Sequence, residues 1–91
     1  MKKVYIITYS WSNKMGGCGD GVYDVFLDIN QATKKFNELV NMEGRCFKED
    51  ISVDEEVQET SQTNEDGSRY VFYGNEHDEF YTASLHVCEP H

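Results

Sequence analysis

Cysteine and histidine residues are the first groups in this sequence that could carry chemistry. His86 and Cys88 stand two residues apart, so in a β-strand both side chains would lie on the same side of a sheet, as half of a metal site does. Further ligands would have to come from a set without diagnostic spacing: Cys18, Cys46, His77 and His91. Cys18 and His77 could instead act as nucleophile and base, with Lys14 favouring the thiolate. No spacing brings these groups together, so three free thiols in a reducing compartment are the simpler interpretation.

Two short segments imitate ligand-binding loops. Residues 16–21 have the glycine content of a phosphate-binding loop, but such a loop leads into a helix N-terminus, and here we expect a strand to follow. Residues 64–67 resemble part of a calcium loop, but Gln62 and Tyr73 would then occupy its first and last ligand positions, and neither fits. We therefore expect a hairpin loop and a turn, with neither a metal ion nor another cofactor.

Charge is distributed very unevenly along the chain. Residues 1–48 carry seven Lys or Arg and five Asp or Glu, whereas residues 49–91 carry twelve Asp or Glu and a single cation, Arg69. The halves therefore have net charges of +2 and −11, which sum to −9. Eleven of the carboxylates in the second half form what we call the acidic set: Glu49, Asp50, Asp54, Glu55, Glu56, Glu59, Glu65, Asp66, Glu76, Asp78 and Glu79.

The acidic set has two interpretations, a solvated face that serves solubility and a surface complementary to a basic groove on another protein. Tyr70, Tyr73 and Tyr81 are interleaved with these acids and could supply the aromatic anchors that interfaces favour. The sign of the charge argues against direct binding of DNA or RNA, which requires clustered Lys and Arg. Paired acid–base carboxylates would need a cleft, which a domain this small rarely forms. We predict a partner-binding surface and no catalytic residue.

Length and composition predict one folded domain over residues 1–91. Hydrophobic residues are 38% of the 91 residues, and one Trp, six Tyr and five Phe provide large side chains for a core. The apolar stretch at the start ends at Thr8, which is too early for a signal peptide or a membrane span. We expect a cytoplasmic protein.

The first half of the sequence predicts a hairpin followed by a helix. Residues 2–11 alternate between two apolar faces, which is typical of a central strand, and residues 22–27 suit a second strand after a glycine-rich loop at 15–21. Asp28 and Gln31 have the spacing of a capping box, and Gly44 suits a left-handed helix stop. The spacing predicts a helix over 29–43 with one apolar stripe, formed by Ile29, Ala32, Phe36, Leu39 and Val40.

The second half predicts further strands. Residues 51–57 favour a strand over a helix, although Ser52 and Glu55 imitate a helix cap. Residues 58–68 suit a polar loop that ends in the hairpin-turn dipeptide Asp66-Gly67, and strands follow at 69–73 and 80–88 around a turn at 74–78. The order β-β-α-β-β-β predicts an α+β protein with an antiparallel sheet of four to five strands and one helix on one face.

Part of the sequence resembles a group of known proteins. The segments Val4-Tyr5-Ile6-Ile7-Thr8-Tyr9-Ser10 and Gly21-Val22-Tyr23-Asp24-Val25-Phe26, followed by Asp28 and a helix with Ala32 and Phe36, resemble small proteins of bacteriophages and mobile elements. Those proteins have no assigned catalytic residues, so the resemblance implies none here. In composition alone, the acidic second half is similar to phage inhibitors that imitate DNA, including some anti-CRISPR proteins.

The sequence leads us to expect a non-enzymatic inhibitor of this kind. Its acidic half would occupy the groove in which a nucleic-acid-binding protein holds phosphates, with a CRISPR effector as one example of such a partner. Besides the acidic set, the partner-binding residues would include Tyr70 and Tyr73. Two alternatives stay open: a metal- or thiol-dependent module that uses Cys18, Cys46, Cys88 and His86, and a structural domain whose charge serves only solubility.

Overall fold

Strand β1 (Val4–Ser12) forms from the alternating segment and lies inside the sheet, as its two apolar faces predict. The computed structural model describes residues 3–12, 17–47, 58–74 and 79–89. Within these ranges the other elements are β2 (Cys18–Phe26), α1 (Ile29–Leu39), the π-helix η1 (Val40–Gly44), β3 (Gln58–Thr63), β4 (Arg69–Gly74) and β5 (Phe80–Cys88).

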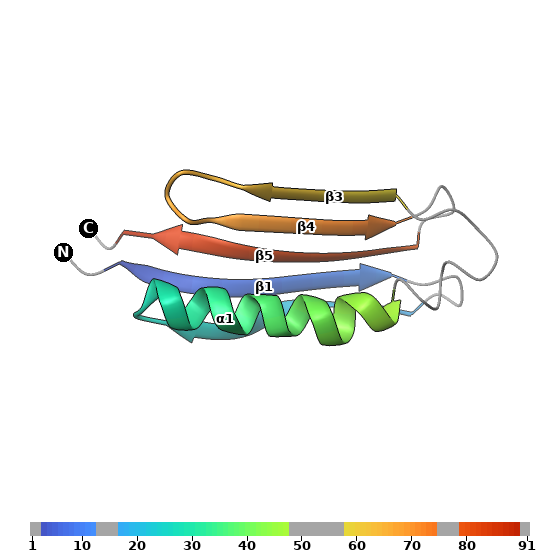
Figure 1. Ribbon diagram of the computed structural model, residues 1–91. Coiled ribbons are helices and arrows are strands. Elements are labelled where there is room, and N and C mark those ends of the chain that lie inside the picture. The colour runs from blue at the N-terminus through green and yellow to red at the C-terminus, as the bar shows by residue number, and fades with distance from the viewer. Residues whose placement is uncertain (1–2, 13–16, 48–57, 75–78, 90–91) are drawn as a thin grey trace.

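The strands form one antiparallel five-stranded sheet in the order β2-β1-β5-β4-β3 (Figure 1). β1 pairs with β5 along its whole length, from Val4 opposite Cys88 to Ser12 opposite Phe80. The first and last strands of the chain are therefore neighbours in the middle of the sheet. The predicted α+β class, with an antiparallel sheet and one helix on one face, is confirmed.

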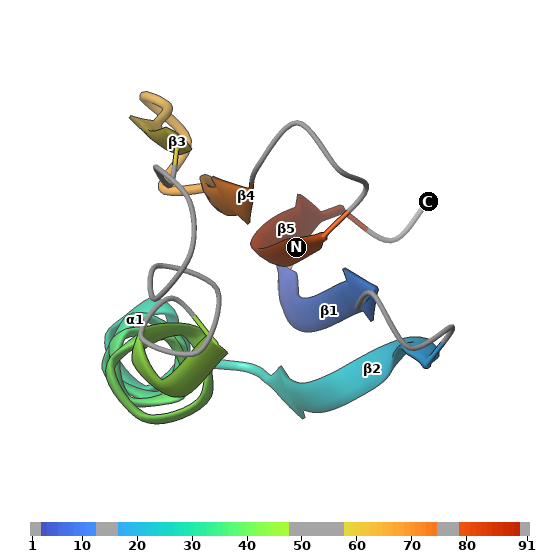
Figure 2. The ribbon, with the colours of Figure 1, turned by 90° about the vertical axis from the view of Figure 1, so that its right-hand side faces the viewer.

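The core lies between α1 and one face of the sheet. Figure 2 looks along the sheet and shows that it curves around the side on which α1 lies. Alternate residues of β1 and β5 point into this space because successive side chains of a strand lie on opposite faces. The buried apolar residues are Ile7, Ala32, Phe36, Leu39, Tyr81, Ala83 and Leu85, and Ile29 and Val40 pack against them, which confirms the predicted helix stripe.

Part of the predicted glycine-rich loop is in fact strand. β2 begins at Cys18, so Gly19 and Gly21 pair with Trp11 and Tyr9 of β1. A Cβ on Gly19 would stand 2.7 Å from the indole Nε1 of Trp11, and a Cβ on Gly21 would stand 3.5 Å from the hydroxyl of Tyr9. Gly19 therefore leaves room for the indole of the neighbouring strand, which explains a glycine within a strand, whereas the contact at Gly21 would be an ordinary one.

The helix begins where the sequence predicts it. Asp28 is the N-cap residue, and its side-chain Oδ1 accepts a hydrogen bond of 2.7 Å from the backbone N–H of Asn30. This bond satisfies one of the free donors of the first turn.

The end of the helix differs from the prediction, because Gly44 is not a left-handed stop. α1 continues into η1, of which Gly44 is the buried last residue. A Cβ on Gly44 would stand 3.0 Å from the ring of Tyr81 and 3.1 Å from that of Tyr73. The glycine therefore lets the helical segment approach two aromatic rings of the sheet.

Strand β3 lies where the sequence suggested a polar loop. Its six residues are all exposed and pair with β4, from Gln58 opposite Gly74 to Thr63 opposite Arg69. A short polar strand is typical of a sheet edge, where it limits pairing with other molecules. The predicted strand at 51–57 lies outside the described residues, so the order along the chain differs from the expected one in the position of β3 and in the addition of η1.

The turn between β3 and β4 is confirmed at Asp66-Gly67. Gly67 has φ 93°, and its backbone N–H donates to the carbonyl of Asn64 over 3.0 Å. A Cβ on Gly67 would stand 3.1 Å from Cδ1 of Ile29, so the turn packs on the first residue of α1.

In the described residues, no helix is long and apolar enough to cross a membrane.

Candidate functional site

Three members of the acidic set lie exposed on the β3–β4 hairpin. Glu59 is in β3, and Glu65 and Asp66 are in the turn. A fourth member, Glu79, is described below. The remaining seven lie outside the described residues: Glu49, Asp50, Asp54, Glu55, Glu56, Glu76 and Asp78. The described part of the predicted surface is therefore the β3–β4 hairpin at one edge of the sheet.

Glu79 does not have the expected surface position. It immediately precedes β5 and is only 7% exposed, and its backbone carbonyl oxygen lies 3.2 Å from where a Cβ of Gly74 would stand. A Cβ on Gly74 would also meet the ring of Phe72 in the same strand, so glycine leaves room for that ring at the end of β4. Glu79 is corrected from an exposed partner-binding residue to a buried one.

The three tyrosines also separate into two groups. Tyr73 and Tyr81 face α1 and stack with ring centroids 6.5 Å apart, and Tyr81 is only 2% exposed. They belong to the core, because neighbouring strands pair Tyr73 with Tyr81 and place both on the helix side. Tyr70 of β4 is 37% exposed, so a partner could reach its side chain.

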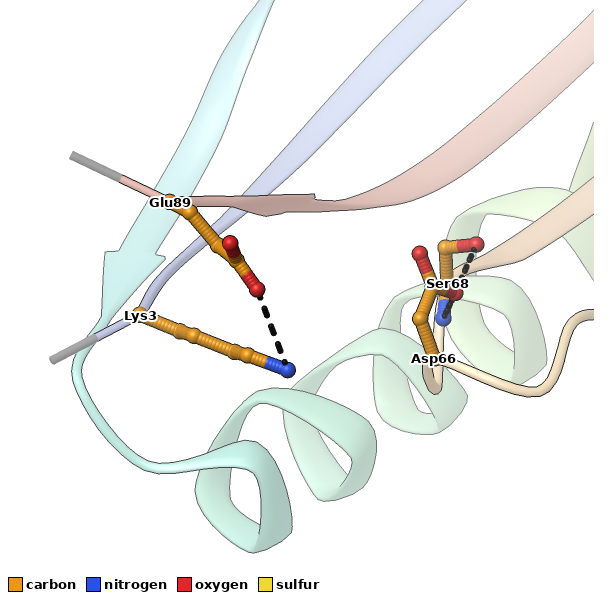
Figure 3. A network of polar contacts seen from close by, with 4 residues as sticks. All are labelled: Lys3, Asp66, Ser68 and Glu89. Carbon is orange, nitrogen blue, oxygen red and sulfur yellow. Dashed lines mark hydrogen bonds and ion pairs between the residues drawn. The ribbon is translucent and has the colours of Figure 1, made fainter. Parts of the chain in front are cut away.

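Hydrogen bonds within the turn stabilise the charge on Asp66. Its Oδ1 accepts from the hydroxyl of Ser68 over 2.6 Å and from the backbone N–H of Ser68 over 2.9 Å (Figure 3). The hydroxyl bond is the larger cause and the backbone bond the next, and together they lower the pKa of Asp66. This carboxylate remains ionised on the surface of the hairpin at neutral pH.

The two ion pairs seen among the described residues do not involve Glu65 or Asp66. Lys3 lies 3.5 Å from Glu89 (Figure 3), and Lys35 lies 3.6 Å from Glu38 one turn along α1. All four side chains are well exposed, so these pairs contribute little to stability. Arg69, the single cation of residues 49–91, is half-buried, and its Nε has no hydrogen-bond partner in the described part of the chain.

A groove of about 330 Å³ separates α1 and η1 from the β3–β4 hairpin. Phe36, Val40 and Val71 provide apolar walls, while the polar groups come from both sides: Asn37, Asn41, Ser61, Gln62, Thr63 and Arg69. The groove thus combines an apolar surface with amide and hydroxyl groups and one guanidinium. In small-ligand sites, polar groups of this kind fix the orientation of the ligand.

A second, more open hollow of about 300 Å³ lies at the C-terminal end of the helical segment. It is lined by Trp11, Glu43, Cys46, Phe47 and Tyr81. The hydroxyl of Tyr81 is buried without a hydrogen-bond partner among the described residues. Burial is the main cause that raises the pKa of Tyr81 far above its usual value, and the nearby Glu43 carboxylate adds to it.

The cysteines and histidine of the thiol or metal alternative are not grouped. Cys18, Cys46 and Cys88 are free and exposed. Cys18 pairs with Ser12 and Cys88 with Val4, so they stand at opposite ends of β1, about 26 Å apart for eight residues of strand. Nε2 of His86 lies 2.9 Å from the hydroxyl of Thr8. The described residues contain no group of three potential metal ligands, and His77 lies outside them.

The groove is the feature that sequence reasoning missed. Two signals pointed to it: Asn37 and Asn41 repeat at a helical spacing beside the apolar stripe, and Arg69 is the one cation in an acidic half. Neither signal shows that the helix and the hairpin face each other, because β3 was expected to be a loop.

No protein-family model, curated protein or solved structure matches the chain.

Proposed function

We propose that the protein is a non-enzymatic binding protein whose acidic second half occupies the basic groove of a nucleic-acid-binding protein, as DNA-mimicking and some anti-CRISPR inhibitors do. The observation that supports this proposal is the excess of twelve carboxylates over one cation in residues 49–91. Within residues 49–91 only Arg69 could neutralise any of them, its side chain is half-buried beside α1, and from the first half Lys3 pairs with Glu89.

The exposed β3–β4 hairpin carries three of these carboxylates. Glu59 is exposed in β3, Glu65 and Asp66 are exposed in the turn that follows, and the hydrogen bonds from Ser68 keep Asp66 ionised. Carboxylates on a rigid hairpin can take the positions of phosphates without the ordering cost of a flexible tail. Long-range attraction to a basic groove would speed association and weaken with salt.

The experiment begins with affinity capture from the native host and continues with displacement of DNA. The captured partner is bound to a labelled DNA duplex, and the protein is added at increasing concentration. We expect it to release the duplex, and the concentration that releases half of it to increase with NaCl. A captured partner that does not bind nucleic acid, or that keeps its duplex, would contradict the proposal.

A pair of charge-matched variants tests whether the hairpin edge is involved. The double variant Glu59→Lys with Glu65→Lys should reduce the association rate at least tenfold, as expected for charges that steer association. The control, Asp20→Lys with Asp24→Lys, makes the same charge change on exposed residues of β2, the opposite edge of the sheet. Equal losses in both variants would show that only net charge matters and would remove the hairpin from the proposed surface.

A further inference from the structure

We propose that the groove between α1 and the β3–β4 hairpin is a binding site for a small organic anion, with Arg69 holding a carboxylate or phosphate headgroup and Phe36, Val40 and Val71 contacting its apolar part. No member of the acidic set lines this groove, although Tyr70 lines it and belongs to the partner-binding residues proposed above.

The groove is formed by rigid elements on both sides. α1 and η1 supply Asn37 and Asn41, and paired strands β3 and β4 supply Gln62 and Arg69. The turn packs on the start of α1 through Gly67 and Ile29, which fixes the hairpin relative to the helix. Its volume of about 330 Å³ is at the lower end of the usual range for small-ligand sites, about 300–1,000 Å³.

Arg69 defines the charge of the ligand. Its Nε is buried and without a hydrogen-bond partner in the described part of the chain, and a buried donor without an acceptor is costly. A guanidinium uses its Nε–H together with a terminal N–H to hold the two oxygens of one carboxylate or phosphate. The described lining residues include no carboxylate, although the protein as a whole has a net charge of −9.

The rest of the lining defines the body of the ligand. The amides of Asn37 and Asn41 can donate to further headgroup oxygens, whereas Nε2 of Gln62 already donates to Oδ1 of Asn64 over 2.7 Å. An inorganic anion would leave the apolar walls uncovered, whereas an anion with a ring or short chain would remove them from water. We therefore expect benzoate and phenyl phosphate to bind better than acetate and inorganic phosphate.

The test is a titration of the ¹⁵N-labelled full chain followed by NMR. Benzoate should shift the backbone amide signals of Asn37, Asn41 and Arg69 and the Nε–H signal of Arg69, whereas benzamide, its neutral analogue, should not. A parallel titration with phenyl phosphate shows which headgroup is preferred, and either preference supports the site. The site is ruled out if no groove signal shifts with either anion, or if benzamide shifts the same signals equally.

Two variants test the role of Arg69. Arg69→Gln should weaken binding of the preferred anion at least tenfold, because it removes a charge-assisted pair of hydrogen bonds. Lys34→Gln makes the same charge change at an exposed position of α1 and should leave binding unchanged. Asn37→Asp, at an exposed helix position, places a carboxylate in the groove and should also abolish binding, so the proposal stays testable if Arg69→Gln does not fold. Unchanged binding in Asn37→Asp, or in a folded Arg69→Gln, would overturn it.

Discussion

The indole of Trp11 fills the space beside Gly19 on the neighbouring strand. Its Nε1 lies 2.7 Å and its Cε2 2.9 Å from where a Cβ on Gly19 would stand, so a side chain at this position cannot be added without moving the ring. Trp11 also packs against the core beneath α1, which limits the movement available to it. The glycine thus decides how the β1–β2 hairpin joins the core.

Gly19→Ala should destabilise the protein by about 1–3 kcal/mol, the usual cost of forcing extra volume into a packed site. Gly21→Ala is the matched control in the same strand. There the nearest atom, the hydroxyl oxygen of Tyr9, is 3.5 Å away, in ordinary contact, so alanine should be neutral or stabilise by up to about 1 kcal/mol through its better strand propensity. Chemical denaturation of both variants measures the difference, and equal values would show that Trp11 moves freely.

The sequence predicted the elements that show in its own periodicity and missed those that depend on contacts between distant residues. Strong periodicity predicted the central strand, the helix stripe and the last strand, because burial follows the alternation of apolar residues. Gly19 and Gly44 were assigned to a loop and a helix stop because the sequence contains no information on which ring will approach them. The polar strand β3 was missed for a related reason, since its pairing with β4 and not its own composition makes it a strand.

Leu39→Ala should cost about 2–5 kcal/mol of unfolding free energy. Leu39 is 1% exposed in the core between α1 and the sheet, so truncation leaves a cavity that neighbours fill only in part. Leu27→Ala is the same chemical change at a residue that is 69% exposed and should cost less than about 0.5 kcal/mol. Urea unfolding of the two variants provides the comparison, and similar losses would place the core elsewhere.

The melting temperature should rise between low salt and a few hundred millimolar NaCl. A net charge of −9 on 91 residues makes the folded state repel itself, and salt screens this repulsion over a Debye length of about 10 Å at 0.1 M. The double variant Glu59→Lys with Glu65→Lys should show a smaller rise, because its net charge is nearer zero. Sucrose of equal osmolality is the control, since it does not screen charge. A melting temperature that does not respond to NaCl would mean that the carboxylates are too far apart to interact.

Tyr81→Phe should keep or increase stability at neutral pH, by up to about 1 kcal/mol, because it removes a buried hydroxyl that has no partner among the described residues. The larger effect concerns alkaline pH. Burial raises the pKa of Tyr81 far above its usual value, whereas the unfolded chain loses this proton near pH 10. Its contribution to stability is therefore complete below pH 10 and is lost as pH rises toward the folded value, at up to about 1.4 kcal/mol per pH unit.

Denaturation between pH 9 and 12 measures this loss. The stability of the wild-type protein should fall more steeply with pH than that of Tyr81→Phe. Tyr70→Phe changes an exposed tyrosine and should follow the wild-type curve. Parallel curves for wild type and Tyr81→Phe would show that the Tyr81 hydroxyl reaches water in the folded protein.

The sequence identified the candidate site only in part, and the reason is physical. The charge excess is a property of composition, so it could be read without a fold, but exposure depends on packing. Glu79 and Tyr73 share their residue types with exposed residues, but Glu79 is buried and Tyr73 stacks on Tyr81 in the core. The groove at Arg69 depends on contacts between segments far apart in the chain, which no local pattern reports.

Ser68→Ala should raise the pKa of Asp66 toward its ordinary value. Of the two hydrogen bonds that stabilise the carboxylate, the one from the Ser68 hydroxyl lowers the pKa more. The backbone N–H of residue 68 remains in the variant, so the rise in pKa should be incomplete. A carboxyl group with a lowered folded-state pKa stabilises the fold at pH values above its pKa in the unfolded chain. This contribution is lost as the pH falls through the pKa of the folded state. The variant should therefore lose some stability at neutral pH and respond less to acid.

Carbon-detected NMR titration of the Asp66 carboxyl measures the pKa directly, with Ser61→Ala, at an exposed position of β3, as the control. An unchanged Asp66 pKa in Ser68→Ala would show that the hydroxyl bond is not kept in solution and that the backbone of the turn alone holds the charge.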